Sequence, residues 1–158
     1  MGEGIETGIY SLREALRTDK IDIIATDHAP HTWEEKQKPY FEAPSGIPTL
    51  QHSLLVMLQL AKQNEITLPQ IVQKMAHNPA DLFQIKDRGY IKKGYFADFV
   101  LINPDKKTTI SNENLFSKCA WSPFEGETLD NKIVATYLNG EKVYDNGQIS
   151  TQKHGMKI

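Results

Sequence analysis

The spacing of apolar and polar positions changes near residue 86 and divides the chain into a helical half and a β-rich half. Before that point, the pattern predicts helices over residues 11–17, 50–62, 67–76 and 78–83. Ser11 and Thr67 begin capping-box spacings, and Asn78-Pro79 has the spacing of a helix start with proline in the first turn. After it, the pattern predicts strands over residues 99–102, 133–138 and 142–144, with Asn139-Gly140 as a type I′ hairpin turn.

One β-branched run interrupts the helical half at residues 21–26 (IDIIAT), and it predicts a buried, parallel strand. A long loop over residues 27–48 follows this strand, and long loops in compact proteins are often functional. Since functional residues of parallel α/β folds lie at the carboxyl ends of strands, we predict that Asp27 and His31 belong to a site. The alternative is that Asp27 caps the next segment and that His28 and His31 are ordinary polar loop residues.

Ser45-Gly46 is a second candidate for ligand contact within the same loop. Glycine lets a ligand approach the backbone closely, so that amide and carbonyl groups can bind its polar atoms. By itself the pair is more typical of a plain turn than of a ligand site.

Composition excludes several classes of function. The 158 residues carry a formal net charge of −2, so they provide neither the basic surface that nucleic acid requires nor a polybasic patch for a membrane. The sequence has no apolar run of about 18 residues that would span a bilayer and no signal-peptide pattern. Its single cysteine, Cys119, has no internal partner for a disulfide, which favours the cytoplasm.

Two groups of motifs resemble one enzyme family, the dihydroorotases of the amidohydrolase superfamily. The first group is residues 25–31 (ATDHAPH) and residues 44–48 (PSGIP), which lead into a helix. The second is residues 77–83, 89–100, 122–126 and 134–140, so the resemblance extends over about residues 11–150. The histidine four residues after Asp27 favours dihydroorotases over hydantoinase- and allantoinase-like relatives, which usually carry another residue there.

The resemblance implies an α/β fold: the C-terminal fragment of a metal-dependent (β/α)8 (TIM-like) barrel, followed by part of a small β-sandwich. Residues 11–85 would then be the last βα portion of the barrel, and residues 86–150 would be the sandwich portion. We expect residues 1–10, which contain three glycines, to be disordered or foreign to the natural protein, and residues 151–158 to form a polar tail.

The same resemblance implies a chemistry, the interconversion of N-carbamoyl-L-aspartate and dihydroorotate in pyrimidine biosynthesis, with one or two zinc ions. Asp27 would be both a metal ligand and the catalytic proton shuttle. His31 would bind the substrate carboxylate, and the Ser45-Gly46 backbone would hold the ring amide. The resemblance implies no role for His28, which could be structural or could support the site from behind.

Most of a metal site is absent from the sequence. There is no His-x-His motif, and Asp27 with His28 and His31 does not make a typical zinc set of three protein ligands and a water. A complete barrel takes about 250 residues. We therefore expect a C-terminal segment that is inactive alone and that forms homo-oligomers or associates with the missing N-terminal part.

Other readings stay open. The chain could belong to a hydantoinase- or allantoinase-type enzyme, or to a non-catalytic assembly partner with the amidohydrolase fold. A third possibility is an independently folded α+β module of unrelated function, which would show a closed core without open strand edges.

Overall fold

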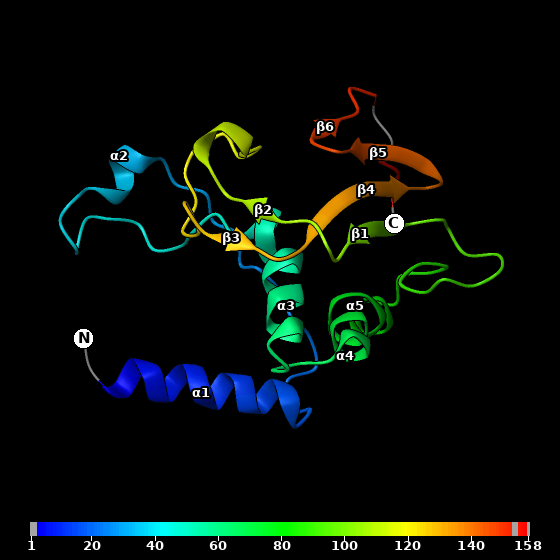
Figure 1. Cartoon of the computed structure of the whole chain (residues 1–158), viewed down its shortest axis with the longest axis horizontal. Helices are drawn as coiled ribbons and strands as arrows, with labels where there is room; N and C mark the ends of the chain where they lie inside the picture. Colours follow the sequence, from blue (N-terminus) through cyan, green and yellow to red (C-terminus); the bar gives the residue numbers. More distant parts are fainter. Residues whose placement is uncertain (1–2, 153–154, 158) are drawn as a thin grey trace.

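The computed structural model describes residues 3–152 and 155–157, in which a helical portion precedes a portion of short antiparallel strands (Figure 1). The helices are α1 (Glu3–Arg17), α2 (Trp33–Lys36), η1 (Leu50–His52), α3 (Ser53–Lys62), α4 (Leu68–Val72), η2 (Gln73–His77), α5 (Asn78–Leu82) and η3 (Asn112–Asn114). The strands are β1 (Phe99–Asn103), β2 (Thr108–Thr109), β3 (Thr128–Leu129), β4 (Lys132–Leu138), β5 (Glu141–Asp145) and β6 (Gln148–Ile149).

The first helix begins earlier than predicted, and parts of the predicted terminal segments lie outside the described residues. Helix α1 begins at Glu3, so the helix start predicted at Ser11 is wrong. The apolar spacing of Ile9, Leu12 and Leu16 continues a helical stripe beyond Ser11, and Leu16 packs against the core. Residues 1–2, 153–154 and 158, which belong to the predicted first segment and tail, lie outside the described residues.

Residues 21–26 do not form the predicted strand: within the described residues they pair with no other strand. They lie beside the helices instead, where the amide of Ile24 donates to the carbonyl of Lys74 at 3.1 Å. Lys74 is fully buried, and its Nζ donates to the carbonyl of Ile21 and to Asp19 Oδ1. A parallel strand needs a neighbour to satisfy its backbone groups, and here helical residues provide part of that bonding.

The two helices predicted over residues 67–83 form one run, in which the π-helical turn η2 joins α4 to α5. The capping box that begins at Thr67 is present, as predicted. Asn78, predicted to cap a new helix, has helical φ and ψ values, and its side chain donates to the carbonyl of Asp22 at 2.7 Å. Helix α5 does begin at Asn78 with proline in its first turn, but Asn78 is not the predicted N-cap, because His77 of the π turn holds that position.

Two small apolar clusters lie on either side of α3, which stands near the centre of Figure 1. Met57 and Leu58 join the first cluster with Ile66 and Ile71. Leu55 joins the second cluster with residues from the β-rich half, Ile110 and Leu129. Helix α3 therefore connects the two halves of the chain.

The larger sheet has the order β1-β4-β5-β6, with every neighbour antiparallel. Asn139 and Gly140 both have positive φ, 55° and 84°, which confirms the predicted type I′ turn between β4 and β5. The short strands β2 and β3 form a second sheet, and their pairing was not predicted because each has only two residues. The division of the chain into domains at residue 86 stays a prediction.

Candidate functional site

Two loop segments, residues 26–29 and residues 46–50, lie side by side. His28 and Ile47 form an isolated parallel bridge, and the amide of Ala29 donates to the carbonyl of Ile47 at 3.2 Å. The hydroxyl of Thr49 donates to the carbonyl of Thr26 at 2.8 Å. The tertiary structure thus brings the Asp27 segment next to the Ser45-Gly46 segment, although eighteen positions separate Asp27 from Ser45 in the sequence.

Asp27 lies between these bonds with its side chain exposed to solvent. Its φ is +44°, a left-handed conformation that costs energy for a residue with a Cβ atom. Such strained residues are found preferentially at functional sites, where the surrounding structure holds them. Among the described residues, no hydrogen bond or ion pair engages the Asp27 carboxylate, which therefore stays open to a ligand.

Gly46 makes the close approach between the two segments possible. Its φ is +95°, and a Cβ atom added there would lie 2.5 Å from the Cβ of Ala29. A side chain at Gly46 would therefore push the two segments apart. Lys36 also holds this loop in place, because its Nζ donates to the carbonyls of Pro44 and Gly46 at 2.7 and 3.1 Å.

His31 is held through its backbone and faces a carboxylate. Trp121 donates from Nε1 to the His31 carbonyl at 2.7 Å, and the Trp121 ring lies 5.8 Å from the ring of Trp33. His31 Nδ1 is 3.7 Å from Glu35 Oε2, an ion-pair distance when the ring is protonated. The backbone amide of Thr32 lowers the pKa of Glu35, and the Thr32 hydroxyl and His31 act in the same direction, so this carboxylate stays charged.

The described part of the chain holds no group of three or more His, Cys, Asp or Glu side chains that could bind a metal ion. Asp27 is a suitable oxygen ligand, but His28 uses its Nδ1 to accept from the amide of Leu50 at 3.2 Å. The residues present therefore do not fit a zinc site on their own.

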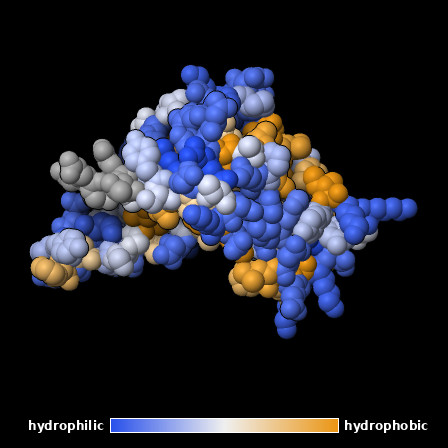
Figure 2. All heavy atoms as spheres, turned by 90° about the horizontal axis from the view of Figure 1, so that it is seen from below, coloured by the Kyte–Doolittle hydropathy of each residue, from blue (hydrophilic) through white to orange (hydrophobic). Residues whose placement is uncertain are grey.

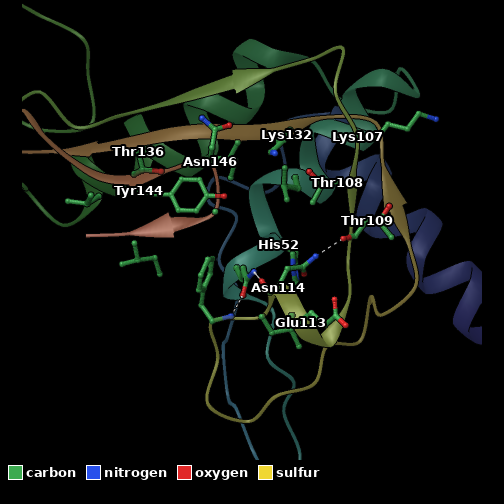
Figure 3. Close-up of a pocket in the computed structure, with 18 residues that line it drawn as sticks. His52, Lys107, Thr108, Thr109, Glu113, Asn114, Lys132, Thr136, Tyr144 and Asn146 are labelled. Carbon is green, nitrogen blue, oxygen red and sulfur yellow. Dashed lines mark hydrogen bonds between the residues drawn. The ribbon is translucent and has the colours of Figure 1, made fainter. Parts of the chain in front are cut away.

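A pocket of about 640 Å³ lies elsewhere, between the start of α3, η3 and the strands β4–β6 (Figure 3). His52, Asn114 and Tyr144 contribute to its wall. His52 is 2% exposed, burial lowers its pKa, and its Nδ1 lies 3.4 Å from the Ser122 hydroxyl. This pocket was not predictable from the sequence pattern, because its wall comes from segments spread over residues 51–149.

The predicted site residues do not line this pocket, nor a second pocket of about 610 Å³ beside α4 and α5. Asp27 and Gly46 are placed in neighbouring segments, Ser45 is exposed beside Gly46, and His31 lies further along the loop against Trp121. Their joint role in one site stays a prediction.

Comparison with known proteins identifies what the chain resembles. A sequence model described as the amidohydrolase family matches residues 3–143. The dihydroorotase of Clostridium acetobutylicum is 44% identical over 132 residues, which are 83% of this chain and 31% of that protein. The dihydroorotase of Halobacterium salinarum is 38% identical over 140 residues, 89% of this chain and 33% of that protein. The chain thus spans about a third of the length of the curated relatives it matches.

Solved structures agree on the fold. The L-hydantoinase (dihydropyrimidinase) from Arthrobacter aurescens superposes with a TM-score of 0.84 at 28% identity, over 89% of this chain and 32% of that chain. A D-hydantoinase structure superposes with a TM-score of 0.81 at 25% identity, over 88% of this chain and 32% of that chain. These matches confirm the fold class predicted from the sequence, a part of a larger barrel protein with adjoining strands.

Proposed function

This chain belongs to the amidohydrolase family, and on that premise we propose that it is the C-terminal segment of a dihydroorotase. The complete enzyme would interconvert N-carbamoyl-L-aspartate and dihydroorotate in the cytoplasm, as a step of pyrimidine biosynthesis. The similarity to curated dihydroorotases at 44% and 43% identity carries the proposal. The solved hydantoinases share less of the sequence, 24% to 28%, and they support the fold rather than that activity.

Asp27 would move the proton in this reaction. Its exposed carboxylate can take a proton from the attacking water and deliver it to the departing amide nitrogen. One or two zinc ions would be bound mostly by residues outside this chain, because Asp27 is the one suitable ligand that the predicted site offers.

His31 would recognise the substrate carboxylate. In the protonated ring, Nδ1–H faces Glu35 and Nε2–H can donate to an anionic oxygen. The backbone at Ser45 and Gly46 would hold the ring amide, although the Gly46 carbonyl already accepts one hydrogen bond from Lys36.

Exposed apolar side chains support association with further protein. Leu68, Val72, Leu82 and Phe83 on the α4–α5 run are 48% to 70% exposed, and apolar patches interrupt the polar surface in Figure 2. Large exposed apolar patches mark contact surfaces. We propose that the rest of the enzyme, or a second copy of it, covers them.

No helix among the described residues is long and apolar enough to cross a membrane.

The complete enzyme that carries this chain tests the proposal. It should hydrolyse dihydroorotate faster than hydantoin or allantoin, measured as kcat/KM for each substrate. The change Asp27→Asn should lower kcat by about 10²- to 10⁴-fold, because the proton transfer loses its carrier. Asp22→Asn is the matched control, since Asp22 is also exposed and uses its carbonyl in the fold.

Two results would contradict the proposal. Preferred turnover of hydantoin or allantoin would support the hydantoinase-type alternative, and no turnover of any cyclic amide would support an assembly partner. The 158-residue chain alone should show no turnover and weak zinc binding, and activity near that of the complete enzyme would refute this part.

A further inference from the structure

Thr49 uses its side chain in an unusual way. It stands at the N-cap of η1, where a threonine hydroxyl normally accepts from an amide of its own helix. Here it makes no such cap, and the hydroxyl donates instead to the carbonyl of Thr26, directly before Asp27. The bond that would stabilise the local helix is used to hold the other segment.

His28 supplies what Thr49 does not. Its Nδ1 accepts from the amide of Leu50, the first residue of η1, at 3.2 Å. That amide is one of the helix-start donors that lack a partner within the helix. Each segment thus contributes one side chain to the other segment's backbone. The Thr49 hydroxyl bonds the Thr26 carbonyl, and the His28 ring bonds the Leu50 amide.

Asp27 lies between these two bonds in its left-handed conformation, φ +44°. The bond from Ala29 to Ile47 adds a third connection on the far side. Peptides on both sides of Asp27 are therefore fixed to one neighbouring segment, while its own carboxylate is unpaired among the described residues. This arrangement restrains the backbone from which the carboxylate projects and leaves the side chain open.

We propose that His28 and Thr49 are positioning residues, which hold Asp27 in the strained conformation from which its carboxylate reaches the substrate. The inference rests on the proposed function of Asp27 in proton transfer. His28 would act by anchoring the residue that follows Asp27 to the amide of Leu50, without touching the substrate. A misplaced catalytic group lowers the rate of the chemical step more than it lowers affinity.

Paired substitutions in the complete enzyme test the proposal. Thr49→Val removes the hydroxyl at constant shape, whereas Thr49→Ser keeps it. His28→Gln removes the acceptor at Nδ1, whereas His28→Asn places an amide oxygen near that position. Thr49→Val and His28→Gln should each lower kcat for dihydroorotate by about tenfold or more, with KM changed less than about twofold. Thr49→Ser and His28→Asn should keep kcat within about threefold of the parent value.

Two further measurements separate positioning from general loss of structure. Thr18→Val is the matched control, because the Thr18 hydroxyl also donates to a carbonyl, that of Glu14 at 2.7 Å, and this bond involves neither residues 26–29 nor residues 46–50. It should leave kcat unchanged. Amide exchange at residues 27–29 should become faster in Thr49→Val and not in Thr18→Val, while bound zinc per protein stays at the parent value.

The outcomes are distinguishable. Equal kcat in the Val and Ser variants, or in the Gln and Asn variants, would overturn the positioning role, as would a fall in kcat that follows zinc content or melting temperature. If the parent enzyme does not hydrolyse dihydroorotate, the proposed function fails, and amide exchange still decides whether Thr49 and His28 restrain the Asp27 backbone.

Discussion

Residues 21–26 and strand β4 have similar sequences and different structures. Both are runs of β-branched and small apolar residues, and both were predicted as strands. Strand β4 pairs along one edge with β1 and along the other with β5, and its Ala135 is 5% exposed. Residues 21–26 pair with no strand within the described residues, and Asp22 and Ala25 are exposed.

The difference shows that a run of β-branched residues makes a segment able to form a strand, and that the strand forms only where a neighbouring strand is present to pair with it. One partner of β4 is close in sequence, since a two-residue turn joins it to β5, whereas its other partner, β1, ends at Asn103. A parallel strand must find its neighbours across long crossovers, because a tight turn cannot connect parallel partners. In the proposed complete enzyme, those neighbours come from residues outside this chain.

Amide hydrogen exchange gives the largest expected contrast between the two regions. In the 158-residue chain, amides of residues 133–138 should exchange at least about a thousandfold more slowly than those of residues 22, 23 and 25, because their strand is bonded on both edges. In the complete enzyme this difference should largely vanish. Slow exchange of residues 22, 23 and 25 in the chain alone would mean that another element already pairs with them.

The next largest effect is expected on substrate affinity, from loss of the proposed contact between His31 and the substrate carboxylate. His31→Ala in the complete enzyme should raise KM for dihydroorotate by about 50-fold, since a hydrogen bond to a charged group contributes about 1.5–3 kcal/mol. Steady-state kinetics measure it, and Trp121 should still hold the unchanged His31 backbone in this variant. An unchanged KM would favour a substrate without a carboxylate near the scissile amide.

The sheet region has an ion pair that tests its stability separately. Arg88, 10% exposed, pairs with Asp98 and donates to Asn139 at 2.6 Å, which ties the β4–β5 turn to the preceding loop. Arg88→Met should lower the free energy of unfolding by about 2 kcal/mol, because it leaves a mostly buried carboxylate without its cation. Denaturant titration followed by circular dichroism measures this change.

The control for Arg88→Met is Lys142→Met, which breaks an exposed pair with Asp145 in the same sheet. It should lower the free energy of unfolding far less than Arg88→Met does, because solvent screens an exposed pair. Equal losses in the two variants would show that burial of the Arg88 pair does not matter for the sheet.

The smallest expected effect concerns pH and His52, whose ring lies between the two halves. Burial lowers its pKa below 6.5, so the unfolded chain binds a proton that the folded chain resists. Stability from the neutral ring is therefore complete above pH 6.5 and is lost as pH falls through the folded pKa. Melting temperatures between about pH 7.5 and 5.5 should fall less in His52→Asn than in the parent; parallel curves would contradict the assignment.

Several features were predictable because their causes are local. The Asn139-Gly140 turn, the Thr67 capping box and the helix after residue 50 follow from side chains within a few positions of one another. The π turn before Pro79 was not predictable, because Asn78 turns its side chain to Asp22, which is distant in sequence. The extension of α1 to Glu3 was hidden by glycines that the helix tolerates.

The sequence by itself determined the family, the candidate residues Asp27, His31, Ser45 and Gly46, and the strands joined by short turns, because motifs and tight turns are local. Only the tertiary structure decided that residues 21–26 pair with helical residues and with no strand among the described residues, and that residues 26–29 lie against residues 46–50. It also decided that Thr49 gives up its own helix cap to hold the peptide before Asp27. The physical reason is that these contacts satisfy backbone groups across long stretches of chain, where the spacing of residues carries no information about the partner.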